Sequence, residues 1–193
     1  MKRTTFDKIV TFVGLGLAVF LLIAAGLLNW GATFASGTVA SQLEAQQISI
    51  PASNGDPDAT ADVVAFFEEN ADKTMSTGKQ AQMYADHFIG YHLSKMPTYA
   101  AATGLARSAA GAAAMDPTNA EAQAALAKAN ATVESVFKGE TLRGMLLNAY
   151  AFGTLGMIAS IAAMVTLVGA IVLFILVFFG IRHIRRTPED ATI

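Results

Sequence analysis

Cysteine is absent from the sequence, which excludes disulfide bonds, thiolate metal sites and lipid attachment through a cysteine. Charge is also scarce, since charged residues make up 15% of the chain and hydrophobic residues 53%. A soluble domain usually carries about 25% charged residues. The composition therefore predicts a membrane protein whose parts outside the bilayer hold together by packing alone.

Charge is missing altogether from two apolar blocks, residues 9–28 and 144–181. A helix needs about 20 apolar residues to cross the ~30 Å hydrocarbon core, so each block is long enough. The first block could instead be a cleaved secretory signal, because cations precede it and small residues follow at positions 38–40. Such signals have apolar runs of about 7–15 residues, however, whereas this run is longer and is followed by Trp30, which suits the headgroup layer. We therefore predict two transmembrane helices.

Basic residues that precede the first block and follow the second predict the orientation of the two helices. They are Lys2, Arg3 and Lys8 before the first block, and Arg182, Arg185 and Arg186 after the second. Lys and Arg are enriched on the cytoplasmic side, which makes residues 1–8 and 182–193 cytoplasmic tails. Residues 29–143 contain more acidic than basic residues and are expected outside the cell. The predicted location is the plasma membrane of a bacterium, with lipid and other integral membrane proteins as partners and no nucleic acid.

Helical patterns dominate the exported segment, residues 29–143. Apolar residues at positions 63, 64, 66 and 67 indicate a short amphipathic helix capped by Asp58 or Thr60. A second helix is indicated over residues 79–95, where aromatic and other apolar side chains recur at three- and four-residue steps. Residues 98–114 are mostly alanine, which favours a helix that lies close against a neighbour or stays mobile. Residues 47–50 alternate like a short strand.

The last part of the chain has the pattern of long helices. Asp116 and Pro117 are typical of a helix start. Beyond them the apolar seam of a short coiled coil is spaced as Ala122, Leu126, Ala129, Val133 and Val136. A helix over residues 142–181 would be about 60 Å long, about twice the hydrocarbon thickness. Its outer part is expected to project from the membrane and to pair with residues 116–138 and with the helix over residues 79–95.

These elements predict an all-α membrane protein, in which two transmembrane helices flank an exported, mostly helical bundle and the second helix extends outward into it. Small residues spaced four apart give both helices a face for close packing, because helices in lipid associate where the backbones can approach. The pairs are Gly14 with Ala18 in the first helix, and Ala149 with Gly153 and Gly156 with Ser160 in the second. These faces suit packing of the two helices together or docking on a partner.

One group of polar residues could carry chemistry: Asp86, His87 and His92 on the predicted helix over residues 79–95. Histidines that share a metal on a helix usually stand four apart, and a spacing of five turns the second ring about 140° away from the first. The alternative is that both rings pack, half-buried, among Tyr84, Phe88 and Tyr91, with one hydrogen-bonded to a carbonyl. The spacing favours packing, so we expect no metal and no other cofactor.

Several short segments form a recognisable set: Trp30, residues 39–43 (VASQL), residues 48–50 (ISI), residues 84–93, residues 98–100 (TYA), Asp116-Pro117 and Leu142-Arg143. Together they resemble a family of small two-helix membrane proteins of high-GC Gram-positive bacteria (actinobacteria), commonly labelled aromatic ring-opening dioxygenase. Relative to the family pattern, this chain has an Ala-rich insertion between residues 100 and 116. The resemblance implies an exported domain between two membrane helices and transfers no substrate or site.

The dioxygenase label does not suit the residues available. Ring cleavage by non-haem iron uses about two histidines and a carboxylate converging on one face. The chain has three histidines, and His183 is expected in the cytoplasm while His87 and His92 are expected outside. We therefore expect no enzyme activity.

Two functional hypotheses remain. The chain could be a non-catalytic accessory or structural subunit of a larger membrane complex, with a respiratory-chain supercomplex as the host that the resemblance suggests. It could instead be an exported ligand-sensing or binding module, because two membrane helices flanking a helical bundle resemble the input half of a receptor. Its short cytoplasmic tails would then require the signal to pass to a membrane partner.

Overall fold

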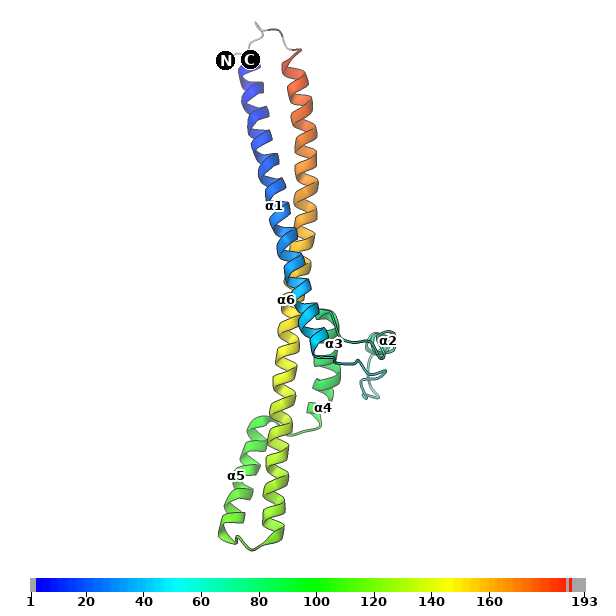
Figure 1. The fold of residues 1–193 in the computed structure, drawn as a ribbon, viewed down its shortest axis with the longest axis vertical. Coiled ribbons are helices and arrows are strands. Elements are labelled where there is room, and N and C mark those ends of the chain that lie inside the picture. Colours follow the sequence, from blue (N-terminus) through cyan, green and yellow to red (C-terminus); the bar gives the residue numbers. More distant parts are fainter. Residues whose placement is uncertain (1–2, 187, 189–193) are drawn as a thin grey trace. The chain divides into compact units, whose positions relative to one another are not determined.

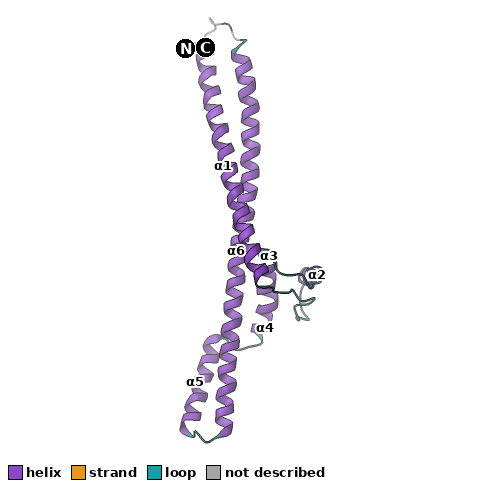
Figure 2. Ribbon diagram, in the orientation of Figure 1, coloured by secondary structure: helices purple, strands orange, loops and turns teal. Residues whose placement is uncertain are grey.

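A computed structural model describes residues 3–186 and residue 188 (Figure 1). Its elements are α1 (Arg3–Ala45), α2 (Ala61–Glu69), α3 (Gly78–Met83), the π-helical turn η1 (Tyr84–Ile89), α4 (Gly90–Ser94), α5 (Tyr99–Met115) and α6 (Ala120–Ile184). The described residues contain no strand (Figure 2). The chain divides into two compact units, one of residues 1–37 with 154–193 and one of residues 38–153. We call these unit 1 and unit 2 and describe each by itself.

Unit 1 is an antiparallel pair formed by the N-terminal part of α1 and the C-terminal part of α6. Small or branched residues are buried at every seventh position, namely Ala18, Ala25 and Ala32 on α1 and Gly156, Ala163, Ala170 and Val177 on α6. This spacing is the heptad of a coiled coil. A methyl group placed on Gly156 would lie 3.2 Å from Ala35 Cβ, and one on Gly14 would lie 3.3 Å from Val177 Cγ2. The two backbones therefore approach closely along an alanine-rich seam.

The close approach in unit 1 predicts a disulfide bond when Ala35 and Gly156 are both replaced by Cys. The two Cβ atoms would lie 3.2 Å apart, so a small shift brings them into the range of about 3.5–4.5 Å found in natural disulfides, and the native chain has no cysteine to interfere. The control pairs Ala35→Cys with Met157→Cys, whose native side chain is exposed on another face of α6. Non-reducing gels of the oxidised protein should show an intramolecular bond in the first pair and little in the control. Equal cross-linking in the two pairs would contradict the seam.

Both long helices have the length and composition of membrane-spanning helices. In the described residues, α1 and α6 each contain an 18-residue stretch that is apolar enough to cross a membrane. Only 11% and 17% of those stretches are buried inside the protein, so they are not the core helices of a globular domain. Large apolar side chains such as Phe12, Phe20 and Ile171 instead face outward.

The core of unit 2 lies where the loop after α1 meets the loop between α2 and α3. A single antiparallel bridge joins Ser49 to Thr74, with Ile50 N–H donating to the Lys73 carbonyl at 3.0 Å and Met75 N–H to the Ile48 carbonyl at 2.8 Å. The bridge brings together a cluster of buried apolar side chains from α1, α2, α3, η1 and α6. They include Val39, Leu43, Ile50, Val63, Phe67, Met75, Met83, Ile89 and Leu146.

A helical hairpin of α5 and the first part of α6 forms the rest of unit 2, and Figure 1 shows the two helices side by side. The predicted seam from Ala122 to Val136 is confirmed, because all five of its residues are buried or half-buried. On α5, the same steps of four and three residues separate buried or half-buried alanines, namely Ala102, Ala106, Ala109 and Ala113. Gln123 Nε2 donates to the Ala113 carbonyl at 3.4 Å, and the rings of Tyr99 and Phe137 lie 6.1 Å apart. The Ala-rich segment is thus a helix held close against α6.

Several predictions about unit 2 are wrong in detail. Residues 47–50 make one bridge instead of a strand, and α1 continues as helix to Ala45. The helix start predicted at Asp116 lies at Ala120, because the Asp116 carboxylate accepts from Thr118 N–H while Asn119 Oδ1 caps the amides of Glu121 and Ala122. Residues 116–138 cannot pair with the last helix, since α6 includes most of them.

Candidate functional site

The candidate residues Asp86, His87 and His92 lie on a helix whose start is fixed by a capping box. Thr77 Oγ1 accepts from Gln80 N–H at 3.2 Å, and Gln80 Oε1 accepts from Thr77 N–H at 3.0 Å. Gln80 Nε2 also donates to Asn70 Oδ1 at 3.1 Å, which ties this helix to the end of α2. The predicted helix over residues 79–95 is confirmed, but its middle turn, η1, is π-helical.

Asp86 contacts α6. Its carboxylate accepts from Arg143 Nη2 at 3.1 Å, and both side chains are half-buried. Further contacts between these helices are made by small residues: a methyl group on Gly139 would meet the Leu93 side chain, and one on Gly90 would lie 3.7 Å from Arg143 Nε. The predicted pairing of the last helix with this segment is therefore confirmed. Asp86 serves as an ion-pair partner across that helix contact.

His87 contributes its backbone to a buried contact. Its carbonyl accepts from Asn54 Nδ2 at 3.2 Å, and Asn54 is 3% exposed. Asn54 Oδ1 in turn accepts from Asp56 N–H at 3.2 Å. The pKa of Asp62 is lowered, first by a hydrogen bond from the Thr60 hydroxyl and, as the smallest contribution, by the charge of His87. The His87 side chain itself is half-buried.

His92 packs against aromatic rings at helical spacing. Its Nδ1–H donates to the Phe88 carbonyl, 2.7 Å away, and its ring centroid lies 4.5 Å from that of Phe88. The Phe88 ring lies 4.8 Å from that of Tyr84, whose pKa is raised by burial. Lys95 Nζ stands 4.8 Å from the centre of the Tyr91 ring. The contacts of His92 with an aromatic ring and a carbonyl agree with the predicted packing, but its side chain is exposed and not half-buried as predicted.

Asp86, His87 and His92 therefore each contact a different part of unit 2. Among the residues that the structure describes, no three His, Cys, Asp or Glu side chains stand close enough to hold a metal ion. Residues 84–94, which form η1 and α4, contact α6 through Asp86 and the loop at Asn54 through the His87 carbonyl.

The helix-packing candidates divide between the two units. Gly14, Ala18 and Gly156 lie on the α1–α6 seam of unit 1, and Ala18 is fully buried. Ser160 is exposed, off the seam. Ala149 and Gly153 meet α3 in unit 2, because a methyl group on Gly78 would lie 3.1 Å from the Ala149 carbonyl oxygen and 3.3 Å from Gly153 Cα.

Sequence reasoning missed Gly78, the glycine on α3 that lets this helix touch α6. The only local signal was its place directly after the capping residue Thr77, where many residue types are tolerated.

Comparison of the chain with protein-family models, curated proteins and solved structures finds no match. The resemblance to the two-helix membrane family thus stays a prediction.

Proposed function

We propose that this chain is a non-catalytic accessory subunit of a larger membrane complex in a bacterial plasma membrane. The observation that carries the proposal is the length of the charge-free apolar stretch of α6. Residues 144–181 contain no charge and as a helix are about 57 Å long, against a hydrocarbon core of about 30 Å. A tilt of about 40° would absorb only about 39 Å of helix. The surplus needs protein cover. Unit 2 covers part of it at Leu146, Ala149 and Gly153, and a partner subunit would cover the apolar side chains that stay exposed.

The position of the surplus follows from the basic residues near the chain ends. If Lys8 and Arg182 lie at the cytoplasmic surface, the hydrocarbon reaches about 20 residues along each helix, to about residues 28 and 162. Large apolar side chains of unit 1 stay exposed beyond those points. They are Trp30, Phe34, Leu155, Met157, Ile158 and Ile161, which we call the outer collar. Exposed apolar patches of this kind mark interaction surfaces, so the proposed partner is an integral membrane protein that covers the collar.

The proposed topology predicts which positions react with an impermeant thiol reagent in intact cells. A cysteine at Ser53 or Asn119 should be labelled, since residues 29–143 are proposed to lie outside the cell. A cysteine at Thr5, on the cytoplasmic side of Lys8, should be labelled only after the cells are opened. Labelling at Thr5 together with protection at Ser53 would invert the topology.

A ligand-sensing module is the second candidate, and the π-helical turn η1 favours it, because such turns inside α-helices are frequent at functional sites. Asp86 on η1 contacts Arg143 on α6, so a ligand that shifted η1 would act directly on α6. This function predicts a free-standing protein whose protease resistance changes on addition of a small molecule. The subunit function predicts a stable protein partner.

Affinity purification from native membranes in mild detergent, followed by mass spectrometry, tests the subunit proposal. We expect stoichiometric recovery of one membrane complex, and the resemblance proposes a respiratory-chain complex as the host. The variant Leu155→Ser with Ile158→Ser should lose the complex, whereas Leu105→Ser, an equally exposed change on α5, should retain it. Recovery of the isolated chain from wild-type membranes would count against the proposal.

A further inference from the structure

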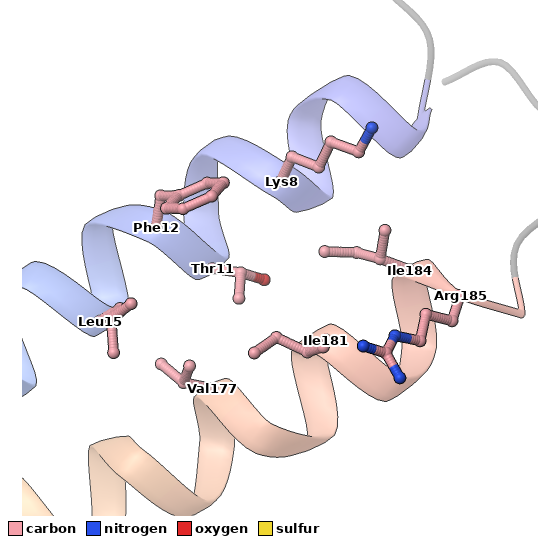
Figure 3. A pocket seen from close by; sticks show the side chains of 8 residues that line it. All are labelled: Lys8, Thr11, Phe12, Leu15, Val177, Ile181, Ile184 and Arg185. Carbon is pink, nitrogen blue, oxygen red and sulfur yellow. The ribbon is translucent and has the colours of Figure 1, made fainter.

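The ends of α1 and α6 in unit 1 flank a half-open cavity that the helix seam does not fill. Its volume is about 300 Å³, and Figure 3 shows side chains from both helices around it. The lining residues are Lys8, Thr11, Phe12, Leu15, Val177, Ile181, Ile184 and Arg185. The alanines of the seam are replaced here by larger side chains, which leave space between the helices.

The lining has two chemical parts. Apolar side chains from both helices form the walls, and Thr11 is the one uncharged polar residue among the lining residues. Lys8 from α1 and Arg185 from the turn after α6 supply two positive charges, and none of the lining residues that the structure describes is acidic. Asp7, the acidic residue next to Lys8 in the sequence, lies beside His183, with 3.8 Å between Asp7 Oδ2 and His183 Nε2. The described lining therefore combines apolar walls with two positive charges.

A second hollow shares Ile181 and Arg185 with the cavity and adds more positive charge. It is lined by Phe178, Ile181, Arg182, Arg185 and Arg186. Basic pockets between membrane helices on the cytoplasmic side attract anionic lipid headgroups, and each Lys or Arg strengthens that attraction. Arginine also donates two parallel hydrogen bonds to a phosphate group. A phosphate with an attached hydrocarbon chain fits both parts of the lining.

We propose that this cavity binds one anionic phospholipid of the inner leaflet, with an acyl chain between α1 and α6 and the phosphate at Lys8 and Arg185. The inference rests on the proposal that these helices cross a membrane, and goes beyond it by assigning a ligand. A soluble phosphate would use the two cations but would leave the apolar walls empty. The acyl chain is thus what separates a lipid from a free phosphate as the occupant.

Native mass spectrometry of the full-length protein in detergent micelles tests the proposal. The probes are phosphatidylglycerol and phosphatidylcholine with identical acyl chains. Wild type should retain one phosphatidylglycerol in preference to phosphatidylcholine, and Lys8→Gln with Arg185→Gln should bind it about 30-fold more weakly. Leu15→Trp, which fills the cavity and keeps both cations, should also lose the lipid. The control Arg107→Gln with Lys128→Gln makes the same charge change in unit 2 and should bind as wild type does.

Any of the following outcomes would overturn the proposal. Equal loss in the control and in Lys8→Gln with Arg185→Gln would show a general charge effect, and unchanged binding in Leu15→Trp would show that no chain enters the cavity. Displacement of the lipid by soluble glycerol 3-phosphate at equal concentration would assign the site to a free phosphate. Failure of wild type to float with lipid vesicles would instead defeat the membrane crossing itself, which separates the two proposals.

Discussion

Replacement of Leu146 by Asp should unfold unit 2. Leu146 is 1% exposed and packs in the cluster that contains Val39, Leu43 and Met83. A carboxylate there would be buried without a partner, which costs several kcal/mol, on the order of the ~5–15 kcal/mol stability of a whole domain. We expect rapid cleavage of residues 38–153 by protease in full-length protein held in detergent. The helical circular dichroism signal of the variant should also be lost at a lower temperature than that of wild type.

The matched control for Leu146→Asp is Met145→Asp, one residue earlier on α6, where the native side chain is 65% exposed. That change should leave the protease resistance of the isolated protein near wild type, within about 0.5 kcal/mol. The conservative change Leu146→Met should cost less than about 1.5 kcal/mol. If Leu146→Asp and Met145→Asp resisted protease equally, the described core of unit 2 would be wrong.

Replacement of Gly78 by Leu should separate α3 from α6. Even a methyl group at Gly78 would lie 3.1 Å from the Ala149 carbonyl oxygen and 3.2 Å from Tyr150 Cα. Backbone atoms of a helix cannot move aside by changing rotamer, so the strain must be relieved by displacing α3. We expect a loss of about 3 kcal/mol in the stability of unit 2, measured by thermal unfolding in detergent.

Gly104 on α5 provides the control for Gly78, because a side chain added there would meet nothing within 4 Å. Gly104→Leu should raise stability by about 0.5–1 kcal/mol, since glycine is a poor helix former. The two substitutions introduce the same side chain and are expected to act in opposite directions. A stabilising effect of Gly78→Leu would show that α3 does not touch α6 at this point.

The elements that periodicity and charge define were predictable from the sequence. The two long apolar helices follow from the charge-free blocks, and the seam from Ala122 to Val136 follows from its heptad spacing. The partner of that seam was not predictable in the same way, because residues 116–138 were expected to pair with the outer part of the last helix. Alanine on α5 covers it instead, since small side chains allow close helix approach without bulk.

For the candidate site, the sequence predicted only that His87 and His92 make separate packing contacts. A spacing of five between His87 and His92 was enough to favour separate contacts, and the structure gives them separate contacts. The ion pair of Asp86 with Arg143 joins residues 57 positions apart, so its partner depended on the tertiary fold. Likewise, the cap predicted at Asp116 failed because Asn119, three residues later, offers the helix a better start.

Photo-crosslinking in intact cells tests most directly whether a partner covers the outer collar. A benzophenone side chain is placed at Leu155, which is 60% exposed, and at Leu105 on α5 as the background position, also 60% exposed. The account predicts a discrete adduct with one integral membrane protein at Leu155 and none above background at Leu105. Adducts with lipid alone at Leu155 would place the collar inside the bilayer and contradict the claim that this chain is a subunit of a larger membrane complex.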